Sequence, residues 1–238
     1  IETVRVSDPA DVIWVRIHTD AGLIGLGETW YASKTVESAV HDHFAPLIVG
    51  RDPFAIERHW LNMFRLSDHA GYGGAELRAI SAIDMALWDI AGKLFDAPIY
   101  QLLGEYRTEM PCYASTYVGD NEPGGLNSPE AYADFAEQCL ELGYRAYKIH
   151  GWSNAPIEKQ IALVHAVGKR VADKMVLMLD PFCAIEKFGD ALRLGWACDE
   201  YKFFWWEDPF KDGGVSAFAH RKLRQLVKTP LLGLVTMM

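Results

Sequence analysis

Three short apolar runs in the middle of the chain each end in residues that could do acid–base or metal chemistry. The first run closes on Lys148-Ile149-His150, the second on Asp180 and the third on Glu207. Carboxylates are the ligands that a hard divalent cation prefers, and lysine and histidine can move protons or stabilise charge. Together these residue types suit metal-assisted acid–base catalysis, provided that the fold brings them into one place.

The spacing of these runs predicts how the four side chains meet. Consecutive runs end roughly 30 residues apart, which is the length of one strand–helix unit, and the sequence between them looks helical. Strands repeated at that interval favour parallel pairing. In a (β/α) barrel the carboxyl ends of the strands open onto one face, where the chemistry is done. We therefore expect Lys148, His150, Asp180 and Glu207 to lie at one end of a parallel sheet.

The first third of the chain follows a different pattern. Residues 12–19 alternate as a strand, a turn follows, and residues 23–28 pair back as a hairpin, which residues 2–6 extend into a small antiparallel sheet. The Gly25-x-Gly27 pair resembles part of a nucleotide-binding loop, but it lacks the third glycine and no helix opens after it. A hairpin that needs glycine for close packing is the favoured interpretation.

Helical segments separate the hairpin from the later strands. They are expected over residues 33–47, 54–64 and 78–95, with a glycine-rich loop over residues 68–76. That loop is either a flexible connection or a mobile cover for a pocket. The next region begins with a strand over residues 111–117, which puts the boundary between two parts of the chain near Arg107.

Composition excludes several classes of protein. The chain has 238 residues, a formal net charge of −9 and a pI near 5.3, which argues against nucleic acid as a partner. No apolar run reaches the roughly 18 to 20 residues of a membrane-spanning helix. No signal peptide is visible, and the four cysteines are dispersed without a disulfide or zinc pattern, so we expect reduced thiols and a cytoplasmic location.

One long segment carries a family resemblance. Residues 79–93, AISAIDMALWDIAGK, followed by residues 98–104, PIYQLLG, resemble the signature of the mandelate racemase/muconate lactonizing branch of the enolase superfamily. The resemblance implies an α/β protein in which an α+β capping domain, residues 1–107, precedes a (β/α) barrel, residues 108–238. Only the first four or five barrel strands would be present in this chain, so we expect a truncated barrel.

The resemblance also implies roles for the four residues. In the family a Lys-x-Lys pair supplies acid–base groups, and here Lys148 and His150 stand in its place, with histidine for the second lysine. Asp180 and Glu207 match the first two carboxylate ligands of a magnesium ion, Mg²⁺. The third ligand should follow Gly233 by about two residues, where residues 234–238 contain no carboxylate. Asp208 is expected to be a turn residue or to support the ligands.

The function implied by the resemblance is removal of the proton next to a carboxylate, followed by dehydration of a sugar acid, an aldonate or aldarate. The chain would then be a lyase that acts on a small molecule and forms a homo-oligomer. A racemase or epimerase of the same family is one alternative, and it needs a second base on the opposite face of the pocket. A non-catalytic remnant with an incomplete metal site is the other.

Overall fold

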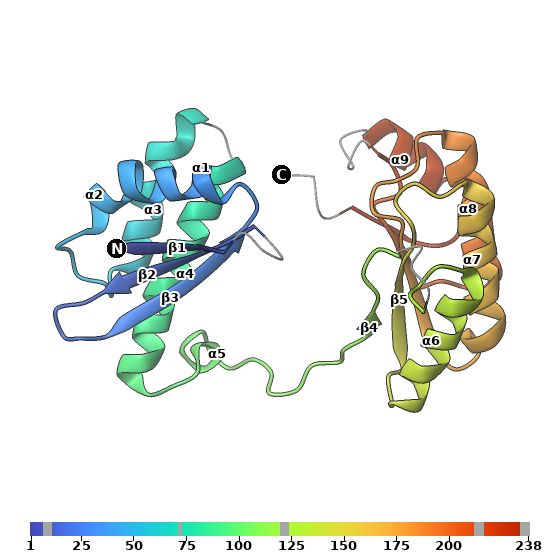
Figure 1. Cartoon of the computed structure of the whole chain (residues 1–238), viewed down its shortest axis with the longest axis horizontal. Helices are drawn as coiled ribbons and strands as arrows, with labels where there is room; N and C mark the ends of the chain where they lie inside the picture. The colour runs from blue at the N-terminus through green and yellow to red at the C-terminus, as the bar shows by residue number, and fades with distance from the viewer. Residues whose placement is uncertain (7–10, 71–72, 120–123, 212–216, 234–238) are drawn as a thin grey trace. The chain divides into compact units, whose positions relative to one another are not determined.

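The computed structural model describes residues 1–6, 11–70, 73–119, 124–211 and 217–233. The chain divides into two compact units, Ile1–Glu109 and Met110–Met238, each with its own buried hydrophobic cluster. The first unit holds an antiparallel sheet and the second a parallel sheet (Figure 1). This confirms the predicted fold class, an α/β protein in which an antiparallel sheet is followed by a parallel sheet. The capping and barrel roles of the two units stay predictions.

The sheet of the first unit is a meander in the order β1-β2-β3. Its strands are β1 (Glu2–Val6), β2 (Val12–His18) and β3 (Ile24–Trp30). Side chains alternate along β2, so that Ile13, Val15 and Ile17 are buried against the helices. The helices are α1 (Ser33–Ser38), a π-helical segment (Ala39–Phe44), α2 (Ala45–Ile48), α3 (Ile56–Ser67), a 3₁₀ turn (Asp68–Ala70), α4 (Gly74–Phe95) and α5 (Ile99–Leu102).

Gly25 and Gly27 are packing residues, as the hairpin interpretation predicted. A Cβ atom on Gly25 would lie 2.0 Å from the carbonyl oxygen of Ala86, and one on Gly27 would lie 1.8 Å from that of Ala82. The backbone of β3 therefore lies directly on α4, and only glycine on the strand together with alanine on the helix permits this approach.

The glycine-rich loop is shorter than predicted. Helix α4 begins at Gly74 rather than at Arg78, and the 3₁₀ turn occupies Asp68–Ala70. Ala75, Glu76 and Leu77 are good helix formers, so the first turn of α4 forms as soon as the glycines end. Residues 71 and 72 lie outside the described residues.

The second unit alternates strands and helices. Its strands run in the parallel order β4-β5-β6-β7-β8, and Figure 1 shows α6, α7, α8 and α9 on one face of this sheet. The strands are β4 (Ala114–Ser115), β5 (Ala146–His150), β6 (Val176–Asp180), β7 (Trp205–Glu207) and β8 (Leu231–Leu232). The helices are α6 (Pro129–Glu141), α7 (Ile157–Val171), α8 (Phe188–Glu200) and α9 (Ala217–Arg224).

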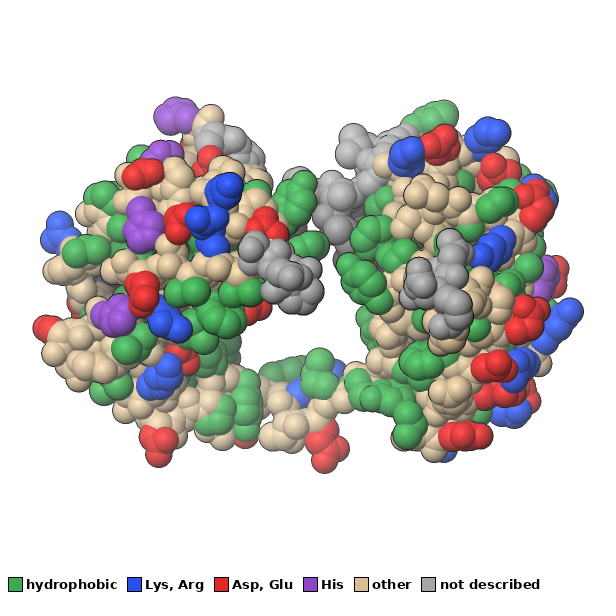
Figure 2. Space-filling model, viewed as in Figure 1, with side chains coloured by type: hydrophobic (Ala, Val, Ile, Leu, Met, Phe, Trp, Pro, Cys, Tyr) green, Lys and Arg blue, Asp and Glu red, His purple; other side chains and the backbone are tan. Residues whose placement is uncertain are grey.

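The surface carries both signs of charge. Figure 2 shows acidic and basic side chains interspersed over the visible face of each unit, without one large basic area on that face. In the part of the chain that the structure describes, no helix is both long and apolar enough to cross a membrane.

Candidate active site

The register of the parallel sheet brings the predicted site residues to one end of it. His150 on β5 is the register partner of Asp180 on β6. Leu179 on β6 pairs with Trp206 on β7, so Glu207, one residue further on, falls into the same row as Asp180. Lys148 precedes His150 by two residues, and residues two apart on a strand share a face. The four side chains therefore point to the same side of the sheet at the ends of three adjacent strands.

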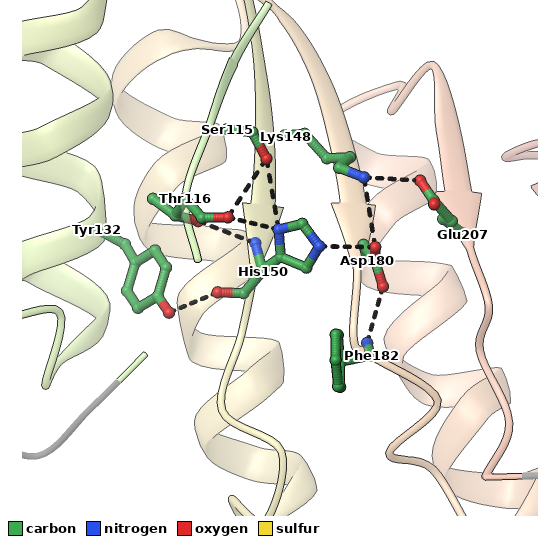
Figure 3. A network of polar contacts seen from close by, with 8 residues as sticks. All are labelled: Ser115, Thr116, Tyr132, Lys148, His150, Asp180, Phe182 and Glu207. Carbon is green, nitrogen blue, oxygen red and sulfur yellow. Dashed lines mark hydrogen bonds and ion pairs between the residues drawn. The ribbon is translucent and has the colours of Figure 1, made fainter. Parts of the chain in front are cut away.

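The four side chains are in direct contact (Figure 3). Lys148 Nζ lies 3.0 Å from Oε2 of Glu207 and 3.4 Å from Oδ2 of Asp180, so one ammonium group bridges the two carboxylates. His150 Nε2 lies 2.8 Å from the same Oδ2 of Asp180. The side chains of Lys148, Asp180 and Glu207 are 10%, 7% and 6% exposed, so the contacts are shielded from water. The structure thus brings together all four residues that the sequence singled out.

The contacts within the network favour the charged forms of Asp180 and Lys148. Burial alone would raise the pKa of Asp180, but the hydrogen bonds from His150 and from the Phe182 amide, with the charges of His150 and Lys148, lower this pKa below its ordinary value. Burial would lower the pKa of Lys148, and the hydrogen bond and charge of Glu207 reverse that effect and raise it. A buried carboxylate–ammonium cluster of this kind is a common feature of functional sites.

The imidazole of His150 is held on its other side by β4 and the residue after it. Nδ1 lies 2.5 Å from the carbonyl oxygen of Thr116, and Ser115 Oγ lies 3.4 Å from the same nitrogen (Figure 3). The hydroxyl of Tyr132 donates a hydrogen bond of 2.5 Å to the His150 carbonyl. Because a carbonyl oxygen only accepts, Nδ1 is the donor in this contact, and Nε2 is the nitrogen that faces Asp180.

Several residues around the site were not anticipated from the sequence. The ring of Tyr113 lies with its centroid 5.9 Å from Lys148 Nζ, and the ring of Phe182 stands edge-on to His150. Phe182 has a positive φ of 58°, and its amide donates to Oδ1 of Asp180 at 2.9 Å. An aspartate that accepts from the amide two residues on is a common turn, so Asp180-Pro181-Phe182 offered a signal for this contact.

Asp208 directly follows Glu207 in the chain. It is 1% exposed, has a positive φ of 37°, and its amide donates to the carbonyl of Leu232 at 2.8 Å. A non-glycine residue in this backbone region is strained, and such strain is concentrated at functional sites. The role predicted for Asp208, in a turn or behind the ligands, stays a prediction.

The carboxylates of Asp180 and Glu207 fit a hard divalent cation as a pair. They converge on one positively charged group, and Mg²⁺ in proteins is often held by one or two carboxylates together with water. Among the residues that the structure describes, no group of three or more histidine, cysteine, aspartate or glutamate side chains is arranged to hold a metal ion. The position predicted for a third ligand, within residues 234–238, lies outside the described residues.

Comparison with known proteins agrees with this architecture. Residues 3–104 match the mandelate racemase/muconate lactonizing enzyme N-terminal domain, and residues 131–234 match the enolase C-terminal domain-like family. The unit with the antiparallel sheet and the unit with the parallel sheet thus correspond to two domains of the enolase superfamily. Within it, the chain belongs to the mandelate racemase/muconate lactonizing enzyme family, as the motif over residues 79–104 predicted.

Two curated relatives are dehydratases of sugar acids. D-xylonate dehydratase of Haloferax volcanii is 30% identical in an alignment of 226 residues, and the match covers 88% of this chain and 53% of that protein. D-galactonate dehydratase of Verminephrobacter eiseniae is 35% identical in an alignment of 175 residues, and the match covers 72% of this chain and 43% of that protein. The chain spans about half the length of these relatives.

A solved structure agrees with the fold. The crystal structure of D-glucarate dehydratase from Agrobacterium tumefaciens, complexed with magnesium, superposes with a TM-score of 0.82 at 29% identity. The alignment covers 93% of this chain and 58% of that one.

Proposed function

We propose that this chain provides the proton-abstracting residues of a magnesium-dependent sugar-acid dehydratase. The observation that carries the proposal is the direct contact of Lys148, His150, Asp180 and Glu207 at adjacent strand ends. The similarity to dehydratases of D-xylonate and D-galactonate supports a polyhydroxy acid as substrate, rather than an acid without a β-hydroxyl group.

His150 is the proposed base. In the structure both ring nitrogens face acceptors, so Nε2 acts as base only after it has given up its proton and left Asp180. It then takes the proton from the carbon next to the substrate carboxylate, and the electron pair of the broken C–H bond moves toward that carboxylate. Histidine suits this step because its ordinary pKa lies close to neutrality. Asp180, at 2.8 Å from Nε2, holds the ring in place and stabilises it once it has gained the proton.

Lys148 stabilises the charge that develops as the proton leaves. Its ammonium group lies at the strand ends, where it bridges Glu207 and Asp180 and would be close to a substrate bound beside them. The C–O bond at the β-carbon then breaks, and the hydroxyl leaves with a proton as water. The resulting enol takes up a proton at the β-carbon and loses the proton of its hydroxyl group, which gives a 2-oxo-3-deoxy acid with the net loss of one water from the substrate.

Asp180 and Glu207 are the residues that would hold the magnesium ion. When bound, such an ion neutralises negative charge on a substrate carboxylate. The ammonium of Lys148 now satisfies both carboxylates, so binding of a cation requires that Lys148 turn toward the substrate. This places the lysine charge beside the developing enolate.

Deuterium exchange tests the proposal without knowledge of the product. The protein is incubated with Mg²⁺ in D₂O with D-xylonate, D-galactonate or D-glucarate, and the hydrogen at C2 is followed by NMR. We expect exchange at C2 and formation of a 2-oxo-3-deoxy acid with at least one of these acids. Inversion at C2 without loss of water would instead favour a racemase or epimerase.

The residue assignment is tested by a matched pair of variants. His150→Asn should abolish exchange, whereas His165→Asn, on the outer helix α7 beside Tyr201, should leave it unchanged. Retention of exchange and turnover by His150→Asn would show that the base lies elsewhere. If Mg²⁺ binds but neither the unaltered protein nor the variants exchange the hydrogen at C2, the result would favour a non-catalytic remnant.

A further inference from the structure

We propose that Thr116 is a positioning residue for His150, because its hydroxyl takes over a hydrogen bond of the sheet and frees its carbonyl to hold the imidazole. The inference rests on the proposed function, in which His150 is the base. It concerns a residue that lies one position beyond strand β4 and does not belong to the cluster of charged side chains.

The pairing of β4 with β5 changes at Thr116. The Thr116 amide donates to the carbonyl of Lys148 at 3.2 Å, as in regular parallel pairing. In such pairing the carbonyl of the same residue accepts from the amide two residues further along the partner strand, which here is His150. The His150 amide instead donates to the Thr116 hydroxyl oxygen at 3.0 Å. Strand β4 accordingly ends at Ser115.

The carbonyl released in this way binds the side chain of the same histidine. The Thr116 oxygen lies 2.5 Å from Nδ1, so Thr116 contacts both the backbone and the ring of His150 (Figure 3). With Nδ1 fixed as a donor, Nε2 is the nitrogen directed at Asp180, at 2.8 Å. The ring is therefore held between two acceptors in one orientation, with Nε2 toward the strand ends.

The hydroxyl is the part of Thr116 that this arrangement requires. Thr116 is 6% exposed, so water cannot easily replace it as the acceptor for the His150 amide. The His150 carbonyl is fixed on the opposite side by Tyr132, at 2.5 Å, so the backbone of His150 cannot shift to find another partner. Valine at position 116 would have nearly the same shape without an acceptor, and the amide would reclaim the carbonyl. Serine would retain the acceptor.

Imidazole NMR on the resting protein tests the inference independently of catalysis. Protein labelled with ¹⁵N-histidine should show a slowly exchanging Nδ1–H resonance that disappears in His150→Gln, which assigns it. We expect this resonance in the unaltered protein and in Thr116→Ser, and its loss in Thr116→Val. An unaltered protein that lacks the resonance contradicts the proposal even if Thr116→Val does not fold. A folded Thr116→Val that keeps the resonance also contradicts it.

Kinetics then connects ring position with the reaction. Thr116→Val should lower kcat for C2 exchange by about 100-fold, because a misplaced catalytic group costs on this order, while KM changes little. Thr116→Ser should recover most of kcat. Equal losses in the serine and valine variants would exclude the hydroxyl as the cause. If the resonance behaves as expected but the unaltered protein exchanges none of the acids, the proposed function fails and the positioning role stands.

Discussion

Lys148 and Glu207, which are 59 residues apart in sequence, form a buried ion pair of 3.0 Å between the ends of β5 and β7. The same ammonium lies 3.4 Å from Asp180, so it is the positive charge between two buried carboxylates. Two carboxylates that face each other without a cation repel, and burial increases the repulsion. The presence or absence of a positive group between the two carboxylates should therefore control the stability of the second unit. The same position should control the affinity of this unit for a divalent cation.

Lys148→Met should destabilise the protein in the absence of divalent cations. Removing one partner of a buried ion pair typically costs about 3–5 kcal/mol of unfolding free energy, because the opposite charges stay buried without compensation. Mg²⁺ should restore part of this loss, since it can take the place of the ammonium between the carboxylates. Urea unfolding with and without Mg²⁺ measures both effects. Lys211→Met, which removes an exposed ion pair with Glu186, is the control and should change little. Equal effects of the two substitutions would contradict a special role for the cluster.

Glu207→Gln should weaken Mg²⁺ binding by about 10-fold to 100-fold or more. Loss of residues that merely support metal ligands costs this much affinity, and loss of a ligand should cost no less. Isothermal calorimetry on the folded variant gives the dissociation constant. Glu186→Gln, an exposed carboxylate in the same unit, should bind Mg²⁺ as the unaltered chain does. Unchanged affinity in Glu207→Gln would move the metal to other residues.

The four central site residues could be predicted from the geometry of parallel strands. Each apolar run ends in a polar side chain, and the carboxyl ends of parallel strands meet on one face, so the sequence places Lys148 and Asp180 together. The packing role of Gly25 and Gly27 could also be predicted, because the pair lacks the third glycine and the helix of a nucleotide-binding loop. Their partner, helix α4, is known only from the structure.

Thr116 could not be predicted, because its role depends on an exchange of hydrogen-bond partners. Strand β4 comprises only Ala114 and Ser115, so the sequence offers little alternation there. The hydroxyl matters only because the ring of His150 occupies the carbonyl that would otherwise pair with the neighbouring strand. The start of α4 was missed for another reason. Glycines on either side of Tyr72 marked a loop, and they obscured the helix that begins at Gly74.

Gly27→Ala should be strongly destabilising. The added methyl group would lie 1.8 Å from the Ala82 carbonyl oxygen, which belongs to a helix backbone and cannot turn away. Separating β3 from α4 disturbs the core of the first unit, so we expect a loss of about 3 kcal/mol or more, at the upper end of the cost of overpacking. Gly189→Ala in helix α8 is the control, because a Cβ there meets nothing within 4 Å. It should be neutral or stabilise by about 0.5–1 kcal/mol. Thermal unfolding followed by circular dichroism compares the two, and similar midpoints would show that β3 and α4 are not in close contact.

Asp84 on α4 should make the first unit less stable at neutral pH than at mildly acidic pH. Burial raises the pKa of this carboxyl above its ordinary value of 3.8, so the folded state keeps the proton over a pH range in which the unfolded state has lost it. The folded state then binds more protons in that range, and stability falls as pH rises through it. The penalty is absent below the unfolded pKa and is fully present once the pH exceeds the folded pKa.

Asp84→Asn removes this ionisation while keeping the shape of the side chain. We expect its thermal midpoint to exceed that of the unaltered chain at pH 7, with the difference shrinking as the pH approaches about 4, the ordinary range of a carboxyl group. Because the chain carries a net charge of −9, the loss of any negative charge could relieve repulsion. Asp20→Asn, in the exposed turn after β2, controls for that effect and should show a smaller gain. A gain at pH 7 that is the same for both variants, or that persists unchanged at pH 4, would mean that burial of Asp84 does not set its effect on stability.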